Sequence, residues 1–284
     1  MDRKALVREA MQAASDLRDR LDLDPFGPVD PYAAAQALGV KVVLLGASME
    51  GFYFKGPPGR ILLSALRPVG RRTFTCAHEL GHHIFGHGST MDQLQEDERP
   101  DTNKPDEILA NGFAAFFLMP SVGVRGAFTL RGWKIESATP TQIFTIACQY
   151  GVGYQTLVSH LSYTLRDITA ARRAELERWT PQRIRRHLLK DEFDSLIIID
   201  RENEASGFDV EKGAAILLPN DLEVDGIALA HMGSFDADTD LYRAVKRGVS
   251  TVEGLDEPFE IRVMLKEYKG AAANRFLEDP DEED

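Results

Sequence analysis

The stretch RTFTCAHELGHHIFG, residues 72–86, carries two histidines and a glutamate at a spacing that suits one face of a helix. On an α-helix of 3.6 residues per turn, positions four apart lie on the same face, about 6 Å apart along the axis. The imidazoles of His78 and His82 can therefore converge on one metal ion. Glu79 lies about 100° further round the helix, beside the open side of such a site.

This spacing is the HExxH pattern, in which two histidines bind zinc and the glutamate serves as a general base. The surrounding helix carries apolar residues on the side expected of a core helix, namely Phe74, Ala77, Leu80, Ile84 and Phe85. Burying two imidazoles and a carboxylate without polar partners would cost free energy. The pattern therefore favours a metal site over a chance match on an exposed helix.

Length and charge indicate a two-domain protein with an acidic surface. At 284 residues the chain exceeds the usual size of a single domain. Its net charge of −12 includes the six acids of residues 278–284, and removing those six charges leaves −6. We expect residues 273–284 to form an acidic, disordered tail. An acidic body also disfavours non-specific binding to nucleic acid.

The sequence predicts a cytoplasmic protein. Its two cysteines, Cys76 and Cys148, are too few for a disulfide framework and fit a reducing compartment. The N-terminal residues include acids and lack the long apolar core of a signal peptide. No stretch approaches 18 consecutive apolar residues, so we expect no membrane span.

The residues before the motif predict two helices and a small sheet. Apolar residues recur at helical spacing over 3–21 and 31–38. Short apolar runs predict strands at 40–45, 51–54 and 60–64, the last two joined by a turn rich in glycine and proline. Two helices, a small sheet and the helix with the histidines make an α+β arrangement.

A catalytic zinc site needs a third protein ligand beside two histidines. The extended pattern HExxHxxGxxH would require a glycine at position 85 and a histidine at position 88, but the chain has Phe85 and Gly88. His83 and His87 are out of register for it, and we expect them to belong to the helix end or the following loop. A carboxylate from beyond that loop would give a site of two histidines and one acid.

The acidic, proline-broken residues 88–106 predict a long surface loop, and an apolar helix follows up to Met119. Glu107, in the first turn of that helix, is the best-placed acid, and Asn111 one turn later could support it by a hydrogen bond. On geometry alone, four other acids compete with it: Glu96, Glu98, Asp101 and Asp106. An acid at a helix N-terminus is also favourable without any metal.

Two separated segments, FTCAHELGHHIFGH (74–87) and DEILANGFAAFFLMP (106–120), resemble the ImmA/IrrE metallopeptidases, the family of the IrrE N-terminal-like domain. In that family an acid lies four residues before the asparagine of an Asn-x-Phe-Ala-Ala run, and this rule selects Glu107 as the third ligand. Family members often carry a second glutamate two residues before the asparagine, where this chain has Leu109. The resemblance covers about residues 30–165 and implies a zincin-like fold with a catalytic zinc.

We expect residues 1–125 to form this zincin-like metallopeptidase domain. Residues 126–168 predict a helix-turn-helix-like segment, with the turn at Gly151 and a second helix over 153–164. The family resemblance implies that this segment packs on the peptidase domain. The residues expected to be exposed on that second helix are Tyr154, Gln155, Ser159, His160 and Ser162. None is Arg or Lys, so we expect no direct reading of DNA, which needs cations for phosphate contacts.

Residues 169–192 predict a basic linker helix. Its basic face could simply be exposed to solvent, or it could bind an acidic partner. Residues 193–272 predict a β-rich domain, sandwich-like or barrel-like. If the chain acts as the family resemblance implies, this domain would sense a signal or hold the partner. Its expected strands lie at 196–200, 214–218, 226–232, 241–245 and 258–268. His231 is alone there and is expected to be structural.

These patterns lead to a zinc-dependent endopeptidase in which His78, His82 and Glu107 bind the metal and Glu79 is the catalytic base. Manganese or iron in place of zinc is left open, as is a dimer. The hairpin at 51–64 is expected to align the substrate as an added strand. The resemblance implies that the substrate is a specific regulatory protein, such as a helix-turn-helix repressor encoded nearby, whose cleavage switches gene expression under stress.

The alternative is a regulatory module without catalysis, which binds DNA or protein and keeps a vestigial metal site. It would act through the basic segment or the helix-turn-helix. The chain keeps the complete HExxH motif and Glu107 at the position of a third ligand. This weighs against the alternative, because a vestigial site tends to lose a ligand.

Overall fold

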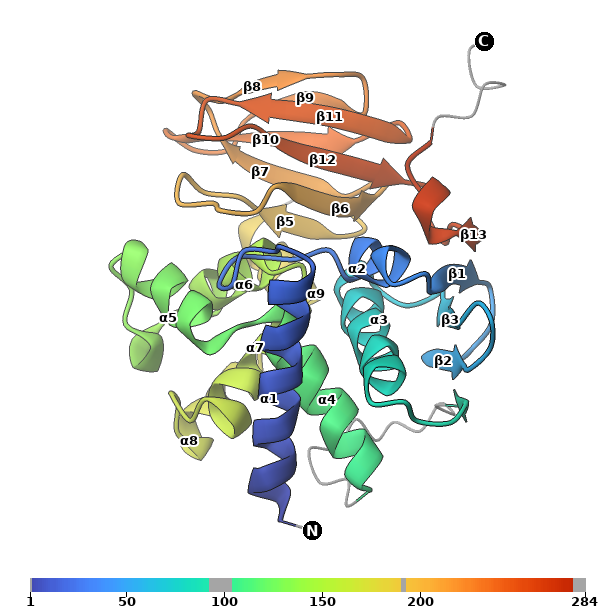
Figure 1. The fold of residues 1–284 in the computed structure, drawn as a ribbon. Helices are drawn as coiled ribbons and strands as arrows, with labels where there is room; N and C mark the ends of the chain where they lie inside the picture. Colours follow the sequence, from blue (N-terminus) through green and yellow to red (C-terminus); the bar gives the residue numbers. More distant parts are fainter. Residues whose placement is uncertain (1, 92–103, 190–192, 278–284) are drawn as a thin grey trace. The chain divides into compact units, whose positions relative to one another are not determined.

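The structure is a computed structural model that describes residues 2–91, 104–189 and 193–277 (Figure 1). The chain divides into two compact units. Residues 1–124 and 267–274 form the first, and residues 125–266 and 275–284 form the second. Helices and small sheets occur in both, so the predicted α+β class is confirmed.

The helices of the first unit begin and end where local signals predict. They are α1 (Arg3–Arg20), α2 (Pro31–Ala37), α3 (Val69–Ile84) and α4 (Pro105–Leu118). The carboxylate of Asp30 accepts hydrogen bonds from the backbone N–H groups of Tyr32 and Ala33, and Pro31 occupies the first helical position. The helix α5 (Ser121–Leu130) follows α4 directly and lies outside the predicted helices.

The first unit contains one five-stranded sheet. Its strands are β1 (Lys41–Leu45), β2 (Gly51–Phe54), β3 (Arg60–Ser64), β4 (Thr90–Met91) and β13 (Gly270–Ala271), in the order β13-β1-β3-β2-β4. Only β1 and β3 run parallel, and the other pairs are antiparallel. The hairpin edge that we expected to take a substrate strand is partly occupied, because β4 pairs with Phe52 and Tyr53 of β2.

The strands β4 and β13 were not predicted, and β13 lies in the stretch assigned to the β-rich domain. A two-residue strand has no alternation of its own, so it forms only because a neighbouring edge offers hydrogen bonds. For β13 that edge is β1, where Val43 lies opposite Ala271.

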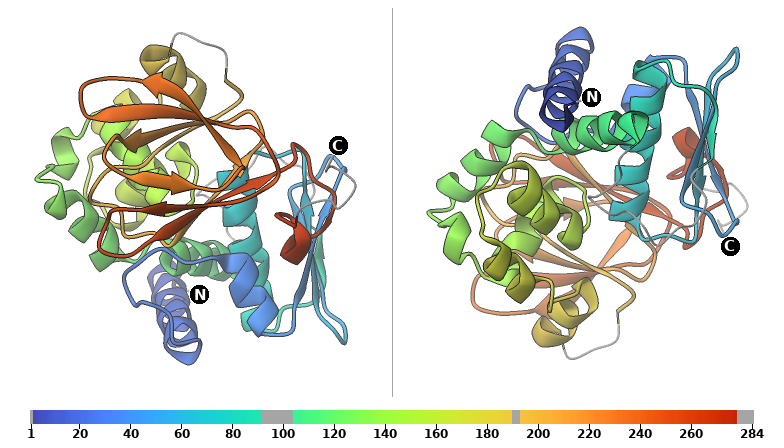
Figure 2. Two further views of the ribbon diagram at one scale, coloured as in Figure 1. Left: turned by 90° about the horizontal axis from the view of Figure 1, so that it is seen from above. Right: turned by 90° about the horizontal axis from the view of Figure 1, so that it is seen from below.

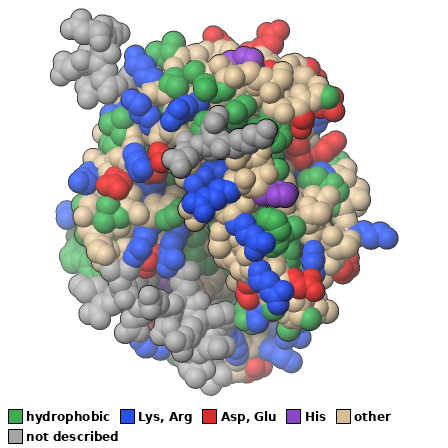
Figure 3. All heavy atoms as spheres, turned by 180° about the vertical axis from the view of Figure 1, so that it is seen from behind, with side chains coloured by type: hydrophobic (Ala, Val, Ile, Leu, Met, Phe, Trp, Pro, Cys, Tyr) green, Lys and Arg blue, Asp and Glu red, His purple; other side chains and the backbone are tan. Residues whose placement is uncertain are grey.

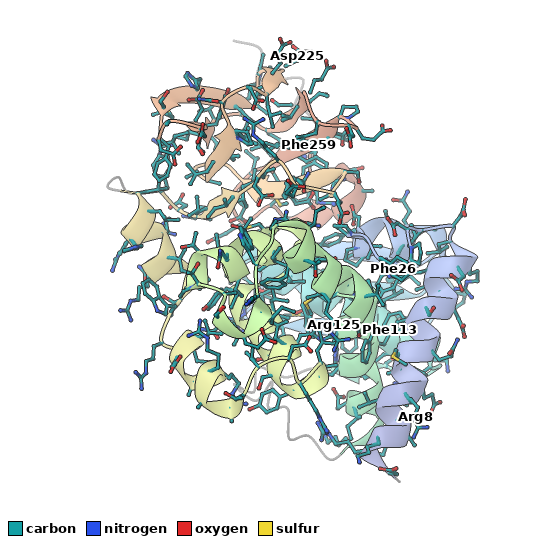
Figure 4. The ribbon with its side chains drawn as sticks, turned by 90° about the vertical axis from the view of Figure 1, so that its left-hand side faces the viewer. Arg8, Phe26, Phe113, Arg125, Asp225 and Phe259 are labelled. Atoms are coloured by element: carbon teal, nitrogen blue, oxygen red, sulfur yellow. The ribbon has the colours of Figure 1, made fainter. Side chains whose placement is uncertain are left out.

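Close helix contacts build the core of the first unit. A Cβ atom added at Gly81 of α3 would lie 3.1 Å from the Cα of Ala110 on α4, so the two backbones approach closely there. Leu80, Phe113 and Phe117 are fully buried. Figure 2 shows α3 and α4 against one another, and Figure 4 labels Phe113 among the packed helices.

The second unit begins with short helices. They are α6 (Pro140–Gln149), α7 (Tyr154–Ser159), α8 (Ala170–Leu176) and α9 (Pro181–Leu188), with a π-helical turn at His160–Thr164. The single linker helix expected over 169–192 is instead two helices, because Pro181 begins a new one whose first turn is capped by the Thr180 hydroxyl. Residues 190–192 lie outside the described residues.

The second helix of the expected helix-turn-helix is more buried than predicted. Tyr154 and His160, both expected at its surface, are almost completely buried. The Tyr154 hydroxyl donates to the backbone carbonyl of Leu176, and the Gln155 amide donates to that of Trp179. The sequence could not indicate this, because the covering helix α8 and its following turn are placed by tertiary packing.

Two four-stranded sheets complete the second unit, in the orders β5-β7-β10-β9 and β6-β12-β11-β8. The strands are β5 (Leu196–Ile198), β6 (Gly207–Glu211), β7 (Ala215–Pro219), β8 (Glu223–Asp225), β9 (Leu229–Ser234), β10 (Thr239–Ala244), β11 (Gly248–Glu253) and β12 (Phe259–Met264). Side chains from both sheets, including Ile216, Leu218, Phe259 and Ile261, share one core. Each of the five predicted strands overlaps a strand of the structure.

Three strands, β6, β8 and β11, lie outside the prediction. The strands β8 and β11 contain few apolar residues among acidic or small polar ones, so pairing with neighbouring strands decides their structure. The strand β6 does alternate Phe208 and Val210 with acidic residues, but it is only five residues long. The division into units also differs from the expected one, since the helices of 126–189 group with these strands rather than with residues 1–124. Arg131 contributes to that grouping through two hydrogen bonds of 2.7 Å to the carboxylate of Asp200.

Among the described residues, one stretch has the length and composition of a membrane-spanning helix. It is Pro105–Leu130, which comprises α4 and α5. Of its most apolar part, 56% is buried inside the protein, as expected of a core helix. Both cysteines are free and buried. On the face shown in Figure 3, Lys and Arg side chains are prominent although the chain is acidic in total.

Candidate metal centre

The helix α3 brings the two histidines of the motif together. His78 and His82 lie one turn apart, both are buried, and their Nε2 atoms are 3.1 Å apart. Two zinc–nitrogen bonds of about 2.05 Å at a tetrahedral angle would separate the nitrogens by roughly 3.3 Å. The observed separation therefore suits two ligands of one ion.

The first turn of α4 adds a carboxylate at the same point. Glu107 Oε2 lies 3.4 Å from His78 Nε2, and Oε1 lies 3.7 Å from His82 Nε2. The three ligand atoms all lie within 4.8 Å of one another, so His78, His82 and Glu107 could hold a metal ion. This placement follows from the close approach of α3 and α4 at Gly81.

The other acids that could have been the third ligand either lie elsewhere or belong to residues that the structure does not describe. Asp106 Oδ1 lies 3.5 Å from His87 Nε2, so that carboxylate faces a neighbouring histidine. Glu96, Glu98 and Asp101 lie outside the described residues.

A contact at Nδ1, the nitrogen that faces away from the candidate metal site, orients the His78 ring. Its Nδ1 lies 3.1 Å from Oδ1 of Asn111, one turn after Glu107 on α4. An amide oxygen only accepts, so the imidazole proton sits on Nδ1 and the lone pair of Nε2 faces His82. The structure thus places Asn111 against the ring of His78, and not against Glu107 as the sequence suggests.

The chemistry of these donors fits a cation. Two imidazole nitrogens of buried histidines and the carboxylate of the partly exposed Glu107, all able to donate a lone pair, converge at one point. A divalent ion could accept all three lone pairs, and imidazole with carboxylate suits zinc, manganese and iron.

Glu79 is fully buried and lies against the beginning of β2. A Cβ atom at position 51 would lie 2.6 Å from Glu79 Oε1 and 2.5 Å from the Thr75 methyl group. Glycine at this position therefore leaves the space that the Glu79 carboxylate occupies. No sequence pattern points to Gly51, because only the packing of β2 on α3 shows the contact.

Residues 35–162 match the family described as the IrrE N-terminal-like domain, Peptidase M78. This segment is an IrrE N-terminal-like domain. The match contains every residue of the candidate centre, and it supports a metallopeptidase-like or regulatory role. No curated protein gives a significant match to the chain.

Among solved structures, one similar chain is described as a Mycobacterium tuberculosis transcriptional regulator. It is 20% identical with a TM-score of 0.36, and the alignment covers 55% of this chain and 46% of that chain. The present chain thus spans about half the length of that protein.

His83 of the IrrE N-terminal-like domain faces the sheet. Its Nδ1 lies 2.8 Å from the hydroxyl of Tyr53 on β2. Burial lowers the pKa of His83, and the charges of Arg20 and Lys55 lower it further. Burial also raises the pKa of Tyr53. A neutral imidazole that accepts from the tyrosine hydroxyl satisfies both groups.

His87 follows the end of α3, but its side chain lies beside the candidate metal centre of the IrrE N-terminal-like domain. Gly86 adopts a φ of 67°, and the backbone N–H groups of Gly86 and His87 donate to the carbonyls of His83 and His82. This left-handed glycine cap reverses the chain at the helix end. His87 Nδ1 then lies 2.8 Å from His82 Nδ1, a contact that the sequence prediction for a loop histidine missed.

Proposed function

We propose that the chain is a zinc-dependent endopeptidase with a centre of His78, His82 and Glu107. The observation that carries the proposal is the convergence of two HExxH imidazoles and a carboxylate from a second helix within 4.8 Å. Membership of residues 35–162 in the Peptidase M78 family supports the same chemistry. Manganese or iron would fit the same donors.

A bound zinc ion would supply a polarising charge for a peptide carbonyl and would lower the pKa of a water molecule to near 7. Glu79 is the residue that moves protons. Its carboxylate takes a proton from the attacking water and then delivers it to the leaving amine. Asn111 holds the His78 ring in the tautomer that leaves Nε2 unprotonated, and Gly51 keeps the Glu79 carboxylate in place.

We propose a specific regulatory protein as the substrate, in the cytoplasm, and a helix-turn-helix repressor encoded nearby is the first candidate. The support is the resemblance of residues 35–162 to the ImmA/IrrE family, because that resemblance implies a regulatory protein as the substrate. The helical α6–α7 region does not favour the alternative of direct DNA binding, because α7 carries no Arg or Lys and its Tyr154 is buried.

The test compares the wild-type protein with Glu79→Gln, each loaded with zinc and incubated with the candidate repressor. We expect cleavage by the wild type, a fall on the order of 10²–10⁴-fold in rate for the variant, and one zinc per chain in both. Glu107→Ala should lose zinc as measured by metal analysis. Cleavage by Glu79→Gln at the wild-type rate would exclude this mechanism.

A further inference from the structure

We propose that His87, hydrogen-bonded to His82 and with Asp106 as a more distant ionic neighbour, forms a relay that fixes the tautomer and orientation of the metal ligand His82. The relay rests on the proposed metal site, but it does not depend on peptidase activity. His82 Nδ1 lies 2.8 Å from His87 Nδ1, and His87 Nε2 lies 3.5 Å from Asp106 Oδ1. The two histidine ligands thus each have a partner at Nδ1, an amide oxygen for His78 and an imidazole for His82.

The direction of the hydrogen bonds follows from the ligand role of His82. A neutral imidazole that binds a metal through Nε2 carries its proton on Nδ1. His82 Nδ1–H must then donate, and His87 Nδ1 must accept. The proton of neutral His87 therefore lies on Nε2, and that is the nitrogen that faces the Asp106 carboxylate. The His82 Nδ1–H donor thus meets an acceptor, and the Nε2–H of His87 faces a carboxylate oxygen 3.5 Å away.

Packing holds the His87 ring in this position. The ring stacks on Phe85 with centroids 5.7 Å apart and an interplanar angle of 22°. Phe85 in turn makes an edge contact with Phe113 of α4. The glycine cap at Gly86 fixes the backbone of His87, whose N–H group donates to the carbonyl of His82. His87 is therefore placed by the same two helices that bring Glu107 to the centre.

His87 and Asp106 differ in burial, and this difference predicts which of them has the larger effect on the position of His82. The side chain of His87 is 10% exposed, whereas that of Asp106 is 65% exposed. Water can replace an exposed carboxylate as the acceptor, but it reaches the part-buried His82–His87 contact less easily. We therefore expect His87 to be the main positioning residue and Asp106 a weaker one.

The test measures zinc affinity by competition with a chromophoric chelator, using the full chain. His87→Phe keeps a ring that can stack on Phe85 but removes the acceptor, and we expect affinity to fall roughly 10- to 100-fold. His87→Gln restores an acceptor and should recover part of the loss. His83→Phe is the matched control, because His83 contacts Tyr53, and its affinity should stay within about twofold of the wild type. Asp106→Asn should change affinity by no more than a few fold.

Circular dichroism and melting temperature establish that each variant is folded. Folded His87→Phe with wild-type affinity would overturn the relay while leaving the metal site intact. A loss that His87→Gln does not recover at all would also overturn it, since packing would then explain the loss. Absence of zinc binding by the wild type would overturn the proposed function itself, and the relay with it.

Discussion

Gly51 shows how a residue without functional atoms can control a catalytic group. The position that a Cβ atom would take is already filled by the Glu79 carboxylate and the Thr75 methyl group. Any side chain at this position must move one of them, and the glutamate is the more mobile because its side chain has more rotatable bonds. The proton-transfer geometry proposed for Glu79 therefore depends on a neighbour that does not take part in the chemistry.

We expect Gly51→Ala to lower the rate of substrate cleavage by about 10- to 100-fold with zinc content unchanged, because it displaces the base and not the metal ligands. Single-turnover cleavage and metal analysis together measure this. Gly59→Ala is the matched control in the same hairpin, since the nearest atom to its Cβ would be 3.6 Å away. Equal rates for Gly51→Ala and wild type would show that Glu79 is not constrained from β2.

At the scale of elements, the centre depends on how closely α3 approaches α4. His78 and His82 belong to one helix and Glu107 belongs to the other, so the distance between the helices sets the distance between ligands. Gly81 lies where the two helices approach closely, between the two histidines in sequence. The glycine within the HExxH pattern therefore has a packing role beside the ligand roles of its neighbours.

Gly81→Ala should move the helices apart by a few tenths of an ångström, because its Cβ would lie 3.1 Å from the Ala110 backbone, which cannot rotate away. We expect a loss of about 1–3 kcal/mol in the free energy of unfolding, together with weaker zinc binding. Urea denaturation of the apo-protein measures the first, and chelator competition measures the second.

Gly126→Ala is the control for Gly81→Ala, because nothing lies within 4 Å of its Cβ position on α5. Alanine is a better helix former than glycine, so this variant should be neutral or more stable by up to about 1 kcal/mol. If both alanine variants gave the same change in stability, close packing at Gly81 would be the wrong explanation.

At the scale of the whole molecule, the C-terminal segment belongs to both units. The chain leaves the second unit at Lys266, adds β13 to the sheet of the first, and rejoins the second at Arg275. Arg275 is almost completely buried, and it donates to Asp209 on β6 over 2.8 Å, while Arg262 donates to the other oxygen of that carboxylate. This ion cluster fastens the returning segment.

A chain that ends at Lys266 should therefore unfold at a lower temperature than the full chain, because it loses the β13 pairing with β1 and leaves Asp209 with one arginine partner fewer. Removing one partner of a buried charge costs on the order of 3 kcal/mol. A chain that ends at Leu277 keeps both features and lacks only the acidic residues 278–284, so its melting temperature should match the full chain. Differential scanning calorimetry distinguishes the two.

The sequence alone determined the elements whose signals are local. The strands at 51–54 and 60–64 and the helix with the histidines form where apolar periodicity and turn residues predict. The choice of His78 and His82 also needed no tertiary information, because their spacing is fixed by the pitch of one helix. For residues 88–106 the sequence predicts only a long loop, whereas Thr90–Met91 form β4 and α4 begins at Pro105. Residues 92–103 lie outside the described part of the chain.

The tertiary structure decided whatever depends on contacts between distant segments. Glu107 reaches the histidines because α4 crosses α3 at a glycine, and the residue-based choice among several acids could not show this. The His87 contact with His82, the Gly51 contact with Glu79 and the pairing of β13 with β1 have the same origin. Local patterns fix which residues can bind a metal, whereas packing fixes which of them meet.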